Sequence, residues 1–146
     1  MPLKPSRRDE DFYAWSLEQA ALLRERKIAE ADIDLIAEEI ESMGKTEKRE
    51  LTSRLAVLLL HLLKWRYQPR GRGNPWRLSI ANARDEIAAL IADNSSLKST
   101  LDDVMTQAYR YARRKAAIDT HIAEERFSGQ CPWSFADVTG EDFWPE

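Results

Sequence analysis

The hydrophobic pattern of the chain is strongest between residues 51 and 67. In the run from Leu55 to Leu63 only His61 is polar. Leucines recur there at helical spacing, which predicts a helix that is apolar on most of its circumference and must be covered by other helices. We therefore predict a hydrophobic central helix over about residues 46–67. Its expected core positions are Leu51, Leu55, Leu58, Leu59 and Leu62, with Val57, Leu60 and Leu63 beside them.

Other segments show the same periodicity of about 3.6 residues. They predict helices over residues 9–26, 32–43, 75–93 and 97–119. Gly44 stands where a left-handed residue would end a helix, so the 32–43 helix is expected to turn there and pack antiparallel to the central one. Arg77 and Arg84 are expected on the face of the 75–93 helix opposite its core. The pattern as a whole predicts an all-α, single-domain bundle of about five helices covering residues 1–146.

The C-terminal residues 127–146 carry five aromatic side chains, more than is typical of a disordered tail. We expect this aromatic segment to pack back on the bundle, with Ser134 capping a short helix over residues 135–138. The alternative is a docking segment for a partner, because Trp and Phe dominate the energetics of many interfaces.

The net charge of −3 hides an uneven distribution. Residues 51–84 hold seven Arg and Lys and no acidic residue, whereas residues 1–50 and 85–146 have net charges of −4 and −6. In one interpretation, acidic outer helices neutralise a basic centre within the molecule. In the other, the basic centre is a patch for an anionic partner.

Composition also bears on location and chemistry. The first eight residues lack the apolar stretch of a secretory signal, and the single cysteine, Cys131, cannot form an internal disulfide. Both features predict a cytoplasmic protein. The hydrophobic run is shorter than the roughly twenty apolar residues of a membrane span, so no membrane association is expected. No phosphate-binding or dinucleotide-binding glycine motif occurs, and no cofactor is predicted.

One candidate site combines acidic residues of the 32–43 helix with basic ones of the central helix. If the two helices pack side by side, Glu38 and Glu41 could meet Arg54 and His61. Such a cluster could serve acid–base chemistry or hold a metal, but the Glu-x-x-His spacing of carboxylate-bridged metal sites is absent, and no metal is predicted. The alternative is that His61 is a structural histidine bonded to a carboxylate of the 32–43 helix.

A second candidate site is a basic and aromatic segment over residues 64–84. Cations can follow a phosphate backbone while aromatic rings stack on bases, a combination used for single-stranded nucleic acid or RNA. The candidate residues are Lys64, Trp65, Arg66, Arg70, Arg72, Trp76 and Arg77. In the alternative interpretation the tryptophans are buried anchors and the arginines a solvated rim. The acidic overall composition disfavours a general nucleic-acid binder.

Several stretches resemble one known family. They are the run from Glu38 to Lys45, the run from His61 to Trp65, Asp11-Phe12-Tyr13-Ala14-Trp15, Pro75-Trp76, Cys131-Pro132-Trp133 and Asp142-Phe143-Trp144-Pro145. Together they are similar to the bacterial "domain of unknown function" family twenty-nine, and the similarity extends over essentially the whole chain. The resemblance implies a small all-helical cytoplasmic protein and implies no activity.

These observations favour a non-catalytic protein-interaction module that acts through a protein partner or as a homo-oligomer. Nucleic-acid binding through residues 64–84 and an enzyme or metal site at the Glu38, Glu41, Arg54 and His61 cluster are the alternatives.

Overall fold

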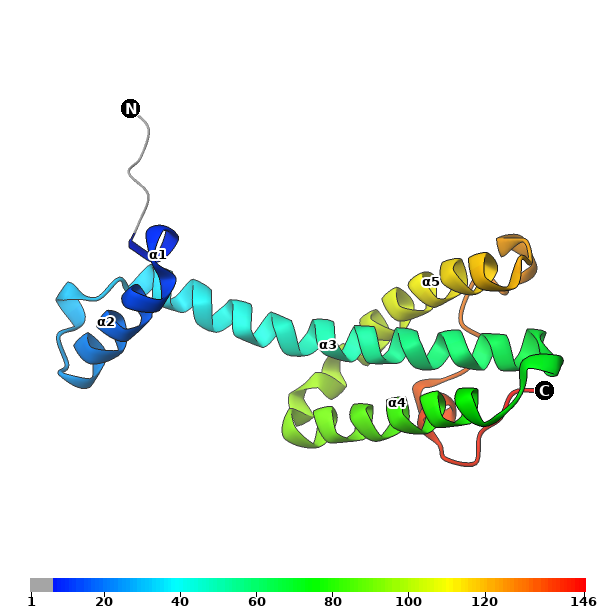
Figure 1. Cartoon of the computed structure of the whole chain (residues 1–146). Helices are drawn as coiled ribbons and strands as arrows, with labels where there is room; N and C mark the ends of the chain where they lie inside the picture. The colour runs from blue at the N-terminus through cyan, green and yellow to red at the C-terminus, as the bar shows by residue number, and fades with distance from the viewer. Residues whose placement is uncertain (1–6) are drawn as a thin grey trace. The chain divides into compact units, whose positions relative to one another are not determined.

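The structure is a computed structural model that describes residues 7–146; residues 1–6, part of the segment inspected for a secretory signal, lie outside the described residues. Every regular element in the described range is a helix, so the all-α prediction is confirmed (Figure 1). The chain divides into two compact units, the first ending at Gly44 and the second spanning Lys45–Glu146. None of the helices described is both long and apolar enough to cross a bilayer.

The first unit contains α1 (Arg7–Glu10), α2 (Phe12–Arg24), a 3-10 turn at Ile28–Glu30 and the beginning of α3 (Ile33–Tyr67). The prediction of a single helix over residues 9–26 is therefore wrong, because the helix is interrupted at Asp11. The Asp11 carboxylate accepts a hydrogen bond from the Ala14 backbone N–H at 3.0 Å. An aspartate in this position satisfies a free N–H group and starts a new helix.

The predicted turn at Gly44 is also wrong, since α3 continues from Ile33 to Tyr67. No glycine in the described range has a positive φ, so Gly44 lacks the left-handed backbone that would end a helix. A glycine within a helix costs only about 1 kcal/mol relative to alanine, and its neighbours on both sides are compatible with a helix. The antiparallel packing predicted for the 32–43 and 46–67 segments required a turn at Gly44, and α3 has none there.

Replacing Gly44 by alanine tests this correction. A methyl group at Gly44 would meet no atom within 4 Å. In a continuous helix, Gly44→Ala should stabilise the protein by roughly 0.5–1 kcal/mol and raise its helix content. In a left-handed turn the same change would destabilise it. Urea unfolding followed by circular dichroism distinguishes the two, and a lower unfolding midpoint would contradict the continuous helix.

The second unit is built around the remainder of α3. Helices α4 (Asn74–Asp93) and α5 (Leu101–Thr120) flank it, and the C-terminal segment with α6 (Phe135–Thr139) closes the unit (Figure 1). Three 3-10 turns connect these helices, at Pro69–Gly71, Ser95–Thr100 and Glu124–Arg126. Residues 97–100, predicted as the start of the 97–119 helix, belong to the second of these turns. In this turn the Thr100 hydroxyl donates a hydrogen bond of 2.7 Å to the Leu97 carbonyl oxygen, immediately before α5 begins.

The core follows the predicted leucine stripe. Leu51, Leu55, Leu58, Leu59 and Leu62 are all fully buried, and Leu60 and Leu63 are nearly so. They pack with side chains of α4 and α5 such as Ile80, Ile87, Val104 and Ala108. Val57 is an exception: its side chain is 40% exposed rather than part of the core.

The C-terminal segment packs back on the bundle, as predicted. Phe127 and Val138 are fully buried in the same core. The centres of the Trp133 and Phe143 rings lie 5.8 Å apart. Ser134 and Asp137 form the reciprocal pair of hydrogen bonds of a capping box at the start of α6. The predicted cap at Ser134 is therefore confirmed.

Arg84 is buried rather than on the exposed face of α4, which corrects the sequence-based prediction. Its side chain donates to the backbone carbonyl oxygens of Val138 at 2.9 Å, Glu141 at 3.3 Å and Phe143 at 2.7 Å. Its guanidinium also lies 5.3 Å from the centre of the Trp144 ring. Burial lowers the pKa of Arg84 from its usual value, but a guanidinium stays protonated in proteins. Arg84 thus fastens the C-terminal segment to α4.

Ion pairs connect basic residues of α3 to acidic residues of α4 and α5. Lys64 Nζ lies 2.8 Å from the Asp119 carboxylate of α5, and this hydrogen bond lowers the pKa of Asp119. Arg54 pairs with Glu86 of α4 at 3.0 Å, and Lys48 pairs with Asp103 of α5 at 2.7 Å. These contacts favour neutralisation of the basic centre within the unit.

Candidate functional site

Two of the four residues of the predicted acid–base cluster are held by other partners. Glu38 pairs with Arg8 at 2.9 Å within the first unit. Arg54 belongs to the second unit and pairs with Glu50 and Glu86. The turn at Gly44 from which the cluster was predicted is replaced by a continuous helix. Glu41 is exposed on α3.

His61 bonds within its own helix. Its Nδ1 lies 2.8 Å from the backbone carbonyl oxygen of Val57, one turn earlier. Within residues 7–146, no three His, Cys, Asp or Glu side chains are grouped so that they could hold a metal ion.

The basic and aromatic residues of the second predicted site do come together, but around a buried indole. Trp65 is 6% exposed, and its ring centre lies 4.5 Å from that of Trp144. The Arg72 and Arg77 guanidinium carbons lie 5.4 and 5.2 Å from the Trp65 ring, and Arg72 Nε donates to the Trp65 carbonyl oxygen at 2.7 Å. Such cation–π contacts stabilise the fold, and they occupy the ring that base stacking would need.

Of the remaining residues of that site, two are held by contacts within the protein and two are exposed. Lys64 is held by Asp119, and Trp76 is half-buried against the core. Arg66 is exposed over the Tyr67 ring, and Arg70 is exposed in the turn before α4. Arg66, Arg70, Arg72 and Arg77 are thus the cations of the set whose side chains are exposed.

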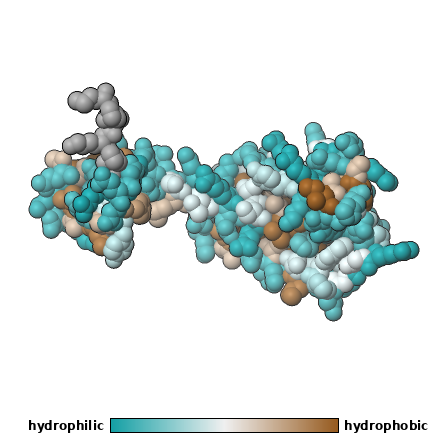
Figure 2. All heavy atoms as spheres, turned by 45° about the horizontal axis from the view of Figure 1, so that its top comes forward, coloured by the Kyte–Doolittle hydropathy of each residue, from teal (hydrophilic) through white to brown (hydrophobic). Residues whose placement is uncertain are grey.

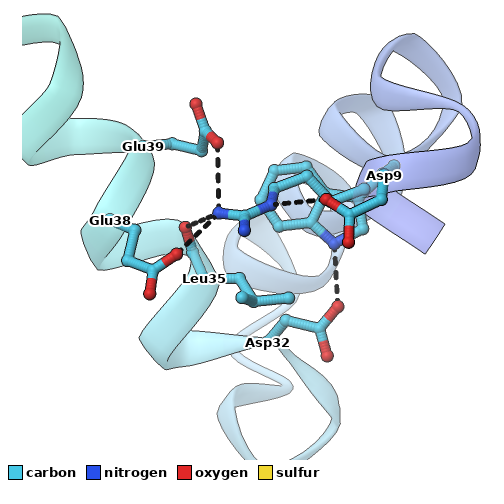
Figure 3. Close-up of polar contacts among 7 residues, drawn as sticks. Asp9, Asp32, Leu35, Glu38 and Glu39 are labelled. Atoms are coloured by element: carbon cyan, nitrogen blue, oxygen red, sulfur yellow. Dashed lines mark hydrogen bonds and ion pairs between the residues drawn. The ribbon is translucent and has the colours of Figure 1, made fainter. Parts of the chain in front are cut away.

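The first unit is held together by Arg8, which sequence inspection did not single out. Its Nη1 donates to Glu38 at 2.9 Å, to Glu39 at 3.1 Å and to the Leu35 carbonyl oxygen at 3.5 Å (Figure 3). The hydrogen bond to Glu38 raises the pKa of Arg8. The sequence feature that could have pointed to Arg8 is the acidic stripe of α3, because such a stripe is stabilised by a cation from elsewhere in the chain.

Further polar contacts lie beside Arg8. Trp15 Nε1 donates to the Asp32 carboxylate at 2.8 Å (Figure 3). The Asp32 backbone N–H donates to Gln19 Oε1 at 2.8 Å. Trp15 and Gln19 are the buried residues of α2. These bonds fix α2 against the start of α3 through polar contacts rather than through a large apolar core.

The first unit therefore leaves most of its apolar side chains in solvent. Seven of the twelve large apolar side chains that are exposed in residues 7–146 belong to it, and brown apolar atoms are visible on its surface in Figure 2. They are Phe12, Tyr13, Leu17, Ile28, Ile33, Ile40 and Met43. Exposed apolar surface concentrated in this way is typical of an interaction site.

Part of this surface forms a regular row on α3. Ile33, Ile36, Ile40 and Met43, here called the isoleucine stripe, are spaced three, four and three residues apart. This is the spacing by which side chains of one helix fit between those of another in a coiled coil. Ile36 is half-buried, while Ile40 and Met43 are 64% and 69% exposed.

Comparison with known proteins gives a family and no function. No curated protein and no solved structure matched the chain. A family model described as "Domain of unknown function DUF29" matches residues 8–144. The resemblance inferred from the sequence is confirmed, and the chain belongs to the DUF29 family.

Proposed function

We propose that this protein is a non-catalytic interaction module that associates with a second copy of itself through the isoleucine stripe. The observation that carries the proposal is the exposure of Ile40 and Met43 within a row of coiled-coil spacing. Covering apolar side chains is favourable by roughly 25 cal/mol per Å² removed from water.

The charges beside the stripe are compatible with an identical partner. The stripe itself contains no charged residue, and two adjoining acids, Glu38 and Glu39, are both paired with Arg8. This pairing reduces the negative charge that two copies bring together, and leaves Asp34 and Glu41 as the exposed acids beside the stripe. Gly44, next to Met43, has no atom within 4 Å of the place where a Cβ would stand, which leaves room for a neighbouring helix.

The contact is short, so the association should be weak. Residues 33–43 cover roughly 16 Å of helix, and binding must offset roughly 4–15 kcal/mol of lost translational and rotational freedom. A dissociation constant in the micromolar range, about −8 kcal/mol, is expected.

Sedimentation at protein concentrations from about 1 to 100 μM, which bracket the expected affinity, tests the proposal. The wild type should shift from the 16.9 kDa monomer towards a larger species as concentration rises. Ile40→Glu should remain monomeric throughout, because a carboxylate would be buried in an apolar contact. Ile118→Glu is the matched control, since Ile118 is 67% exposed on α5 of the second unit; it should behave as the wild type. A wild type that is monomeric at the highest concentration, or that Ile40→Glu leaves associated, would refute the proposal.

A further inference from the structure

A cavity of about 690 Å³ lies in the second unit between α5 and the C-terminal segment. One side is a face of α5 on which Met105, Tyr109, Arg110 and Arg113 recur at helical spacing. The opposite side comes from residues 129–135. Its size is within the range of small-molecule sites, roughly 300–1,000 Å³.

The cavity contains an incompletely bonded arginine. Arg113 Nη2 donates to the Phe127 carbonyl oxygen at 3.3 Å, and its Nη1 lies 3.8 Å from the Glu124 carboxylate. Its Nε has almost no accessible surface and no hydrogen-bond partner among residues 7–146. A ligand in the cavity can therefore pair with Arg113 only through the terminal nitrogens of the guanidinium.

A second cation stands one turn away. Arg110 also lines the cavity, is exposed, and forms no ion pair or side-chain hydrogen bond with the described part of the chain. Two acidic residues also line the cavity. Asp102 lies at the far end of the face, roughly 16 Å along α5 from Arg113, whereas Glu124 lies at the arginine end, where it pairs with Arg113. With Arg110 unpaired, that end of the cavity still carries a net positive charge.

The rest of the wall is uncharged. Trp133, Phe135 and Met105 supply apolar surface. Burial raises the pKa of Tyr109 to about 12 and also raises the pKa of the Cys131 thiol, so both stay protonated at neutral pH. The Tyr109 hydroxyl is already bonded to the Ser128 carbonyl oxygen at 2.6 Å, and the Cys131 thiol to the Trp133 carbonyl oxygen at 3.3 Å.

From the free Arg110, the neighbouring Arg113 guanidinium and the apolar wall, we infer that this cavity binds a small organic carboxylate with an aromatic or aliphatic body. The carboxylate pairs with Arg110 and with the terminal nitrogens of Arg113, while the body packs against Met105, Trp133 and Phe135. This site is independent of the isoleucine stripe, which lies in the other unit.

Calorimetric titration of the full chain tests the inference with three probes: 3-phenylpropionate, the neutral 3-phenylpropanol and inorganic phosphate. The acid should bind at least about tenfold more tightly than the alcohol, because its charge is recognised by two arginines, and more tightly than phosphate. Equal binding of acid and alcohol, phosphate binding as tightly as the acid, or no binding of the acid would overturn it.

Variants locate the site. Arg110→Met removes an exposed side chain and should weaken 3-phenylpropionate binding about tenfold without affecting the fold. Arg113→Lys keeps the charge but removes the planar guanidinium with its terminal nitrogens, and should also weaken binding. Arg114→Met is the matched control, because Arg114 is an exposed neighbour that does not line the cavity, and it should bind as the wild type. Unchanged affinity in Arg110→Met and Arg113→Lys, with both proteins folded, would contradict the assignment.

Discussion

Replacing Leu59 by aspartate is expected to abolish cooperative folding of the second unit. Leu59 is fully buried in the middle of the α3 leucine stripe. Loss of a buried leucine alone costs roughly 2–5 kcal/mol, and an isolated carboxylate in an apolar core adds a further penalty. The sum is comparable to the whole stability of a typical domain, roughly 5–15 kcal/mol.

Thermal unfolding followed by circular dichroism measures this effect. Val57→Asp is the matched control: it makes the same substitution two residues earlier on the same helix, at a side chain that is 40% exposed. Val57→Asp should keep a cooperative transition, while Leu59→Asp should lose it. A cooperative transition of Leu59→Asp at the wild-type temperature would show that the core has been misassigned.

Removal of the Arg84 guanidinium should detach the C-terminal segment. Arg84→Met eliminates three hydrogen bonds to carbonyl oxygens, which then can be hydrogen-bonded only by water. Hydrogen bonds to a charged group contribute roughly 1.5–3 kcal/mol each, so a loss of about 3 kcal/mol or more is expected. Hydrogen exchange of the amides in residues 135–146 should accelerate together with the fall in stability measured in urea.

Arg77→Met provides the comparison for this experiment. Arg77 also lies over the Trp144 ring, at 5.8 Å, but it is exposed. An exposed cation–π contact is worth roughly 0.5–1 kcal/mol, so this variant should lose much less. If the two variants were equally destabilised, the ring contacts rather than the carbonyl hydrogen bonds would hold the segment.

The fold class and core could be predicted because the apolar pattern of residues 51–63 is nearly continuous. A helix with that pattern can remove its apolar side chains from water only by packing against other helices, and the predicted leucines are indeed buried. The end of a helix is much harder to predict. Gly44 was interpreted as a terminator, but one glycine weakens a helix by only about 1 kcal/mol, and the side chains around it all permit the helix to continue.

The contacts of the arginines could not be predicted for a different reason. Arginine is almost never fully buried without partners, so Arg84 was assigned to an exposed face. Its partners are backbone carbonyl oxygens 54 to 59 residues later, and these have no signature in the sequence. The same holds for the cavity at Arg113, whose two walls come from separate parts of the chain, and for Arg8, which pairs with acids 30 and 31 residues away.

The hydrogen bonds of Arg84 also determine which substitutions the C-terminal segment tolerates. Every acceptor is a main-chain oxygen, and Glu141 contributes its carbonyl while its side chain is exposed. These hydrogen bonds do not need a particular side chain at position 141, although the Glu141 carboxylate partly opposes the lowering of the Arg84 pKa by burial. The constraints on the attachment therefore fall on Arg84, on the Trp144 ring beside it and on the buried Phe127 and Val138, while exposed side chains of the segment can vary.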